Sequence, residues 1–303
     1  MTSILVLGAG ELGEAVVHHL ARHPGRPAQT TISILLRPST IESPSPHHVP
    51  VIQQFRDLAV SLVPGDIASL DVDALAEILA KHDIVISCTG FTAGPGSQIK
   101  LAQAALRAGV KRYFPWQFGV DYDTIGRGSA QTLFDEQLDV RDLLRAQSKT
   151  RWTIVSTGIF TSFLFNVFGL LEPQSDGSVA VHALGSLENK VTATTADDIG
   201  RMTAEAVYDD LEGVIFIAGD TISYAQFADI VASVTGRRIL QDVWEVSTLR
   251  ERLRKAPEDN LAKYAVVFAE GKGVAWDESN TLNAKKAIHL ETAMEWARRN
   301  LKV

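Results

Sequence analysis

Gly8-Ala9-Gly10-Glu11-Leu12-Gly13 is the stretch that decides the fold, because of the segments on either side of it. Before it, Ser3-Ile4-Leu5-Val6-Leu7 is a short apolar run that is typical of a buried strand. After it, residues 14–20 carry apolar side chains at helical spacing. A strand, a glycine turn and a helix are the context in which a Gly-x-Gly-x-x-Gly pattern predicts a dinucleotide site.

Each glycine of the pattern has its own role in such a site. Gly8 permits a tight turn, Gly10 lets the backbone approach a pyrophosphate, and Gly13 lets the helix pack against the strand. The first turn of the helix, with Glu11 and Leu12, presents free N–H groups and a positive dipole end to the anion. The alternative is a glycine-rich turn that binds no ligand.

The end of the next predicted strand indicates which nucleotide is bound. Thr31-Ile32-Ser33-Ile34-Leu35-Leu36 is rich in β-branched residues and is followed by Arg37-Pro38-Ser39-Thr40. NAD-binding domains usually place Asp or Glu here, where it accepts hydrogen bonds from the ribose. A carboxylate would repel a 2′-phosphate, whereas Arg37 with the hydroxyls of Ser39 and Thr40 would bind it. The sequence therefore predicts NADPH as cofactor, the alternative being that Arg37 is a solvated charge at the strand end.

The composition is that of a soluble globular enzyme. Of the 303 residues, 46% are hydrophobic and 21% charged, and the formal net charge is −7. No basic run and no long apolar stretch is present, so we expect neither nucleic-acid nor membrane binding. The one cysteine, Cys88, suits the reducing cytoplasm and follows an apolar run, so we expect a core residue there. The first strand begins at about residue 3, so we expect no signal peptide. The histidines show no metal-ligand spacing, so we expect no metal site.

Strand and helix patterns alternate along the first half of the chain. Alternation of this kind predicts an α/β fold of the Rossmann type, with a doubly wound parallel sheet that binds ligands at the carboxyl ends of its strands. We expect a nucleotide-binding domain over residues 1–157 and a smaller, mixed α/β substrate-binding region over residues 158–303. In the latter, residues 179–181 and 190–192 look like one strand pair, and residues 213–217 like a late strand of the main sheet.

Several motifs together resemble one family of proteins. These are, in chain order, Gly8–Gly13, Arg37-Pro38-Ser39-Thr40, the block Lys111-Arg112-Tyr113-Phe114-Pro115-x-x-Phe118-Gly119-x-Asp121, and Asp197-Asp198-Ile199-Gly200. The chain thereby resembles the NmrA-like, isoflavone-reductase-like family of atypical short-chain dehydrogenases, with phenylcoumaran benzylic ether and pinoresinol-lariciresinol reductases among its relatives. The resemblance covers about the first 200 residues well. It implies NADPH binding and reduction of a small, often aromatic, substrate.

The resemblance also implies which further residues contact the cofactor. They follow predicted strands or begin the next helix: Thr89, Gly90, Phe91, Gln98, Trp116, Gln117, Phe118, Thr157, Gly158, Ile159 and Phe160. Trp116 either stacks on the nicotinamide or substrate, or packs in the core. The same two alternatives, pocket or core, hold for the stripe of Phe163, Phe165 and Phe168.

The chain departs from the family at the position of its catalytic lysine. In the family that lysine stands three residues after a phenylalanine and four before an arginine. Phe134 and Arg141 keep this frame, but Gln137 lies between them. A glutamine amide donates a hydrogen bond but cannot cycle a proton. The block also reads Phe114-Pro115-Trp116-Gln117-Phe118-Gly119 where the plant reductases have Phe-Pro-Ser-Glu-Phe-Gly.

The nearest titratable candidates for the proton are Tyr122, Asp121 and Asp123, unless they only form a turn. We expect an NADPH-dependent reductase in which Gln137 orients an oxygen, and Tyr122 or a water held by Asp121 supplies the proton. The alternative is an NADP(H)-binding redox sensor without turnover. The sequence leaves open whether the protein is a monomer or a homodimer.

Overall fold

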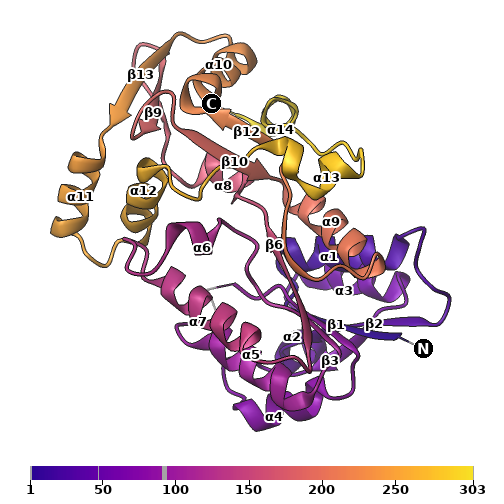
Figure 1. The fold of residues 1–303 in the computed structure, drawn as a ribbon. Coiled ribbons are helices and arrows are strands. Elements are labelled where there is room, and N and C mark those ends of the chain that lie inside the picture. Colours follow the sequence, from indigo (N-terminus) through magenta and orange to yellow (C-terminus); the bar gives the residue numbers. More distant parts are fainter. Residues whose placement is uncertain (1, 47, 91–93, 303) are drawn as a thin grey trace. The chain divides into compact units, whose positions relative to one another are not determined.

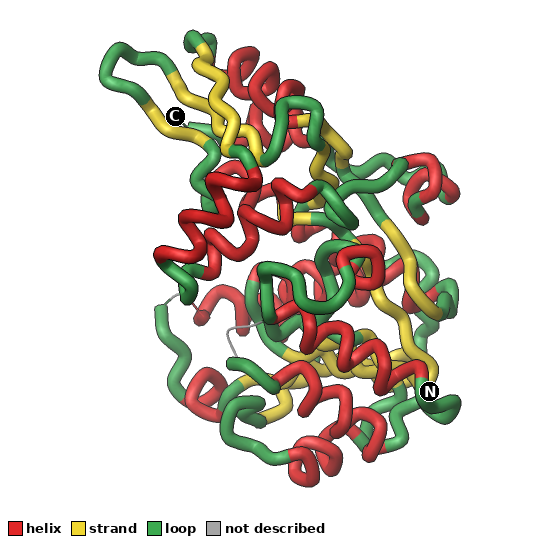
Figure 2. The backbone as a smooth tube through the Cα atoms, turned by 60° about the vertical axis from the view of Figure 1, so that its left-hand side comes forward, coloured by secondary structure: helices red, strands yellow, loops and turns green. Residues whose placement is uncertain are grey.

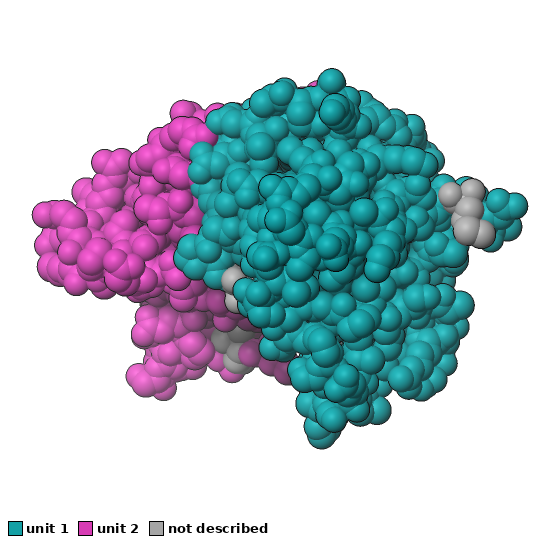
Figure 3. Space-filling view, turned by 90° about the horizontal axis from the view of Figure 1, so that it is seen from below, with its two compact units in different colours: residues 1–117, 136–155, 199–215 teal, residues 118–135, 156–198, 216–303 magenta. Residues whose placement is uncertain are grey.

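In the computed structural model, residues 2–46, 48–90 and 94–302 are described (Figure 1). The chain divides into two compact units, each assembled from separate stretches of sequence (Figure 3). The first unit consists of Met1–Gln117, Glu136–Val155 and Ile199–Ile215. The second consists of Phe118–Asp135, Ser156–Asp198 and Phe216–Val303.

A seven-stranded sheet forms the centre of the first unit. Its strands are listed here in spatial order: β3 (Ser61–Pro64), β2 (Thr30–Leu36), β1 (Thr2–Leu7), β4 (Ile84–Ser87), β5 (Arg112–Phe114), β6 (Arg151–Ser156) and β11 (Gly213–Phe216). The pairs from β3 to β6 are all parallel. Strand β1 is central, and Ile4–Leu7 are fully buried, as expected for a strand covered on both faces. The expected Rossmann-type α/β fold is confirmed, and the late strand β11 joins this sheet.

Helices cover the two faces of this sheet, as Figure 2 shows. One face packs against α4 (Val72–Leu79), α5 (Ser97–Ala108) and α7 (Leu133–Arg145), through a core that includes Leu5, Leu79, Leu101 and Leu144. Helices α1 (Glu11–Arg22) and α9 (Ala196–Tyr208) lie together, because Gly200 approaches Ala15 too closely for any side chain. The other helices of the unit are α2 (Pro38–Glu42) and α3 (His48–Asp57).

Local sequence signals explain where these helices begin and end. The carboxylate of Asp71 accepts a hydrogen bond from the Ala74 N–H and caps α4. Helix α5 ends at Gly109, whose φ of 66° is favourable for glycine and strained for other residues. The parallel sheet needs a crossover helix after most strands, and these caps set the crossover lengths.

The second unit contains two three-stranded sheets. One has the order β12 (Asp220–Ser223), β10 (Lys190–Thr194), β7 (Ile159–Phe160), and the other β13 (Ile239–Trp244), β9 (Val179–Leu184), β8 (Leu171–Pro173). Its helices are α6 (Tyr122–Ile125), α8 (Thr161–Asn166), α10 (Tyr224–Thr235), α11 (Val246–Lys255), α12 (Asn260–Glu270), α13 (Leu282–Lys285) and α14 (Ala293–Asn300), with a 3₁₀ turn at Glu278–Asn280.

The expected pairing of residues 179–181 with 190–192 is wrong. Strand β9 pairs with β8 and, over six residues in parallel, with the distant β13, whereas β10 pairs with β7 and β12. Between β9 and β10, the amide of Asn189 donates to the carbonyls of Leu184 and Phe268. This turn directs the chain toward α12 instead of back along β9, so no hairpin forms.

Candidate functional site

The glycine turn after β1 is as tightly packed as its pattern predicts. Gly8 has φ of 95°, and a Cβ there would lie 2.6 Å from Oγ1 of Thr89. A Cβ on Gly13 would lie 2.0 Å from the carbonyl oxygen of Gly8, which leaves room for hydrogen alone. The turn therefore requires glycine at both positions, for a left-handed backbone at Gly8 and for close helix packing at Gly13.

Gly10 differs from the other two glycines, because the fold itself does not require it. Its φ of −84° and ψ of −175° suit any residue, and it is exposed at the N-cap of α1. A Cβ on Gly10 would meet no atom of residues 2–46, 48–90 or 94–302 within 4 Å. The space beside this glycine is open, as the approach of a pyrophosphate to the backbone requires.

The N-terminus of α1 faces the same turn. Its N-cap residue is Gly10, which has no side chain to cap it, and the first-turn N–H groups of Glu11, Leu12 and Gly13 have no acceptor within the helix. These groups and the helix dipole favour an anion. Partial desolvation raises the pKa of the Glu11 carboxyl.

Arg37 stands at the same edge of the sheet as the glycine turn. It is the exposed N-cap residue of α2 and directly follows β2, which pairs with β1 through Leu35 and Leu7. Ser39 is exposed and Thr40 half-buried in the first turn of α2. The strand order reverses at β1, between β2 and β4, and ligands of open α/β sheets bind at such a point.

The segment after β4 closes the other side of the turn. The Thr89 hydroxyl donates to the carbonyl of Leu7, and the amide of Gln98 donates to the carbonyls of Thr89 and Gly90. Half-buried Trp116 lies against Gly90, where a Cβ would be 3.0 Å from the indole Cζ2. The structure thus brings Thr89, Gly90, Gln98 and Trp116 together beside Gly8, while Phe91 lies outside the described residues.

The backbone carbonyl of Gln137 belongs to a buried polar network of the first unit. Gln117, Gln137 and Arg141 each have 0% exposed surface. Arg141 Nε donates to Gln117 Oε1 over 2.7 Å, and Gln117 Nε2 donates to the carbonyl of Gln137 over 2.8 Å. Gln117 is therefore enclosed in the protein, and it is linked to α7 through the carbonyl of Gln137.

No sequence pattern indicates the residue that anchors this part of α7. The Glu136 carboxylate accepts hydrogen bonds from the N–H groups of Gly96, Gln98 and Ile99, at the start of α5. A carboxylate at a helix N-terminus is stabilised by the free amides and the dipole. Because the two partners are about forty positions apart in the chain, no local pattern could have revealed the contact.

In the second unit, Asp121 and Tyr122 begin α6. The Asp121 carboxylate accepts hydrogen bonds from the Thr124 N–H and hydroxyl, at 3.3 and 2.6 Å, and so caps the helix. Tyr122 is buried, with its ring edge-to-face on Phe134 at 4.9 Å between centroids. Phe118 is also buried. Asp121 therefore has a structural role as a cap, and Tyr122 carries a hydroxyl inside an aromatic cluster.

Residues 157–160 are held rigidly within the second unit. The Thr157 and Gly158 N–H groups both donate to the carbonyl of Gly119, and Thr157 accepts from the Thr194 hydroxyl. A Cβ on Gly158 would lie 2.0 Å from the carbonyl oxygen of Thr192. Ile159 and Phe160 form β7 beside β10.

The phenylalanine stripe after residue 160 packs mainly in the core of the second unit. Phe165 stacks on Trp296 and Phe168 contacts Phe268, and both are buried. Phe163 lies against Phe168. Core packing is therefore the role of Phe165 and Phe168.

Comparison with known proteins identifies the family. The model of the NmrA-like family matches residues 1–297. The chain belongs to the NmrA-like family. It is 45% identical to an NmrA-like family domain-containing oxidoreductase of Gibberella moniliformis, over 97% of this chain and 96% of that protein.

More distant relatives of this NmrA-like chain are plant reductases. It is 29% identical to a phenylcoumaran benzylic ether reductase of Populus trichocarpa, over 89% of this chain and 86% of that one. The fold resembles that of a leucoanthocyanidin reductase from Vitis vinifera solved with NADPH, with a TM-score of 0.77, 21% identity and 97% of both chains covered. An isoflavone reductase structure matches with a TM-score of 0.76 and 22% identity, over 98% of this chain and 99% of that one. The family resemblance predicted from the motifs is confirmed.

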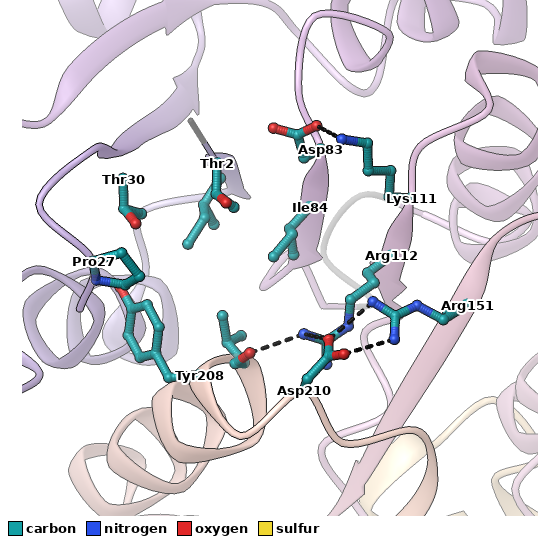
Figure 4. A pocket seen from close by; sticks show the side chains of 12 residues that line it. Thr2, Pro27, Thr30, Asp83, Ile84, Lys111, Arg112, Arg151, Tyr208 and Asp210 are labelled. Carbon is teal, nitrogen blue, oxygen red and sulfur yellow. Dashed lines mark hydrogen bonds and ion pairs between the residues drawn. The ribbon is translucent and has the colours of Figure 1, made fainter. Parts of the chain in front are cut away.

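The NmrA-like chain also has a cavity of about 260 Å³ at the opposite edge of the sheet, where β1, β2, β4, β5 and β6 begin (Figure 4). Arg112, 3% exposed, crosses its floor and donates to the carbonyls of Val207, Ala206 and Leu211 at the end of α9. Asp210 pairs with both Arg112 and Arg151. Burial lowers the pKa of Arg112, while the carboxylate of Asp210 opposes that shift. This network holds the end of α9 and lies away from the glycine turn.

Other functional classes have no matching feature in the described part of the NmrA-like chain. Within it, no group of three or more His, Cys, Asp or Glu side chains is arranged for a metal ion, and no helix is long and apolar enough to cross a membrane. Burial raises the pKa of the Cys88 thiol, which makes it a poor nucleophile at neutral pH.

Proposed function

We propose that this NmrA-like protein is an NADPH-dependent reductase of a small aromatic or secondary-metabolite substrate. One observation carries the proposal. Gly10 is exposed, has open space beside it, and begins α1 without a capping side chain of its own. This turn follows β1, and Arg37 directly follows β2, the strand that pairs with β1. We assign a pyrophosphate to the first position and a 2′-phosphate to the second, at the strand-order reversal. Family membership and the oxidoreductase relatives support the same class of protein.

The first unit supplies the groups that would hold the cofactor. The amides of Glu11, Leu12 and Gly13 bind the pyrophosphate, and Arg37, Ser39 and Thr40 bind the 2′-phosphate. Thr89, Gly90 and Gln98 lie on the other side of the glycine turn, and Trp116, beside Gly90, offers an aromatic face. We also assign Gln117 of this unit to the cofactor and, from the second unit, Phe118 and Thr157–Phe160. When bound, NADPH supplies a hydride for the reduction.

The proton has to come from another group, because Gln137 cannot release one. Gln137 donates a hydrogen bond that orients a substrate oxygen or a ribose hydroxyl. Tyr122 is the proton donor that we favour, since the Asp121 carboxylate is already engaged by Thr124. Because Gln137 has 0% exposure, a ligand reaches its amide only when the residues that enclose it move apart.

The test is NADPH oxidation with a panel of aromatic ketones, aldehydes and benzylic ethers. A positioned general acid is worth about 10²–10⁴-fold, so Tyr122→Phe should lower kcat by that order with little change in KM. Phe134→Leu is the control, because it alters the packing around Tyr122 but removes no hydroxyl. Full turnover by Tyr122→Phe would assign the proton to another group.

The second candidate function is an NADP(H)-binding redox sensor without turnover. The observation in its favour is Gln137, an uncharged and enclosed side chain where the family has its catalytic lysine. If NADPH binds tightly and no member of the panel is reduced, the sensor is the better account.

A further inference from the structure

Both polar atoms of the Gln137 amide are buried without a partner. Neither Nε2 nor Oε1 forms a hydrogen bond with any of the residues that the structure describes. Native proteins rarely leave such atoms unpaired, because burial removes their hydrogen bonds to water. Methionine would fill the same volume without this cost. Packing alone does not explain a glutamine at this position, whereas a ligand or ordered water that pairs with the amide does.

Gln117 determines how Gln137 is held. Its Oε1 accepts from Arg141 Nε at 2.7 Å, which fixes the orientation of the Gln117 amide, so its Nε2 faces the carbonyl of Gln137 at 2.8 Å. That carbonyl belongs to α7 and has a second lone pair available for this contact. All three side chains have 0% exposure, so water does not compete for these bonds.

The neighbouring residue ties the same turn of α7 to the glycine turn. Glu136 binds the first amides of α5, and Gln98 on α5 binds the carbonyls of Thr89 and Gly90. The backbone of α7 at Gln137 is thus held on one side by Gln117 and on the other through Glu136. These contacts anchor the Cα of Gln137 relative to the glycine turn of the first unit.

We propose that Gln117 is a positioning residue for Gln137, and that the two residues depend on each other in charge as well as in geometry. The charge dependence follows from Arg141, which is one helical turn after Gln137 and equally buried. An ammonium at position 137 would face this guanidinium without water between them. Gln117 contacts both residues, so a carboxylate at position 117 would compensate a cation at 137. The effect on turnover rests on the proposed function, whereas the effect on stability does not.

The charge dependence is tested by a double-mutant cycle on the protein without ligand. Gln137→Lys and Gln117→Glu should each lower Tm by about 3 °C or more, and the double variant should lose clearly less than the sum. Gln54→Lys, at an exposed position of α3, is the matched control and should leave Tm unchanged. A Gln137→Lys variant as stable as the wild type, or additive losses in the double variant, would overturn the charge dependence.

The positioning role is tested by a second cycle with methionine, which is close in size to glutamine. Gln117→Met and Gln137→Met should each lower kcat by about tenfold, and the double variant should lose no more than Gln137→Met alone. The NADPH dissociation constant, measured by calorimetry, should change less than about twofold in all three. Multiplied losses in kcat would overturn the positioning role. If the Tm values show the charge dependence but neither the wild type nor any variant reduces a substrate, the charge dependence between Gln117 and Gln137 stands and the proposed function fails.

Discussion

Substitutions at Gly10 and Gly13 should separate nucleotide binding from folding. The two glycines are three residues apart, yet a Cβ would meet nothing within 4 Å at Gly10 and a carbonyl oxygen at 2.0 Å at Gly13. Gly13→Ala must therefore move backbone by about 1 Å, and overpacking of this kind typically costs about 1–3 kcal/mol. Gly10→Val has an allowed backbone conformation. Valine is a poorer N-cap residue than glycine, but it also lowers the entropy of the unfolded chain, so the net change in the free energy of unfolding should be smaller, about 0.5 kcal/mol.

The two variants should affect NADPH binding in the opposite order. Gly10→Val should weaken binding more than Gly13→Ala does, although it costs less stability. Valine at position 10 fills the space of the pyrophosphate and blocks its approach to the amides of α1. Charge-assisted hydrogen bonds contribute about 1.5–3 kcal/mol each, so the loss of two should weaken binding by about 100-fold or more. Thermal unfolding and calorimetric titration of both variants measure the two effects. A folded Gly10→Val that binds NADPH as the wild type does would refute the assignment of the pyrophosphate to this turn.

Three further perturbations test other parts of the account. Arg37→Ala should abolish a preference for NADPH over NADH of at least tenfold, and calorimetry with both nucleotides measures it; equal affinities in the wild type would contradict the role of Arg37. Asp83, whose pKa is lowered to about 2 by the hydrogen bond from Lys111, should stabilise the fold above about pH 4 and lose this effect as the pH falls toward 2. Because Lys111 is largely exposed, Asp83→Asn should cost only about 1 kcal/mol at pH 7 in urea unfolding, and a difference that persists undiminished at pH 2 would be inconsistent with this ion pair. Buried Cys88 should react with a thiol reagent only upon unfolding, and rapid labelling of the native protein would show that the site is open.

Local patterns in the sequence predicted the main sheet and the glycine turn. The roles of Gly8 and Gly13 follow from contacts within one strand–turn–helix unit, so their spacing was sufficient. The pairing of β9 with β13 joins strands far apart in the chain, and the pattern of either strand carries no information about its partner. The wrong hairpin between residues 179–181 and 190–192 came from a preference for neighbours in sequence.

The same limit applies to the candidate catalytic residues. The frame of Phe134 and Arg141 located Gln137, because all three lie on one helix. Its enclosure and its link to Gln117 depend on a contact between α7 and the segment after β5, which no periodicity encodes. The engagement of Asp121 as a cap is local, and the Asp-x-x-Thr spacing could have indicated it.

Transfer of deuterium from NADPH labelled at the nicotinamide C4 distinguishes a reductase from a redox sensor. The protein is incubated with the labelled cofactor and the panel of aromatic ketones, aldehydes and benzylic ethers, and the products are examined by mass spectrometry. We expect that at least one substrate is reduced and gains a single deuterium, from one face of the nicotinamide only. Tight binding of NADPH without deuterium in any product would contradict a reductase and leave the redox sensor.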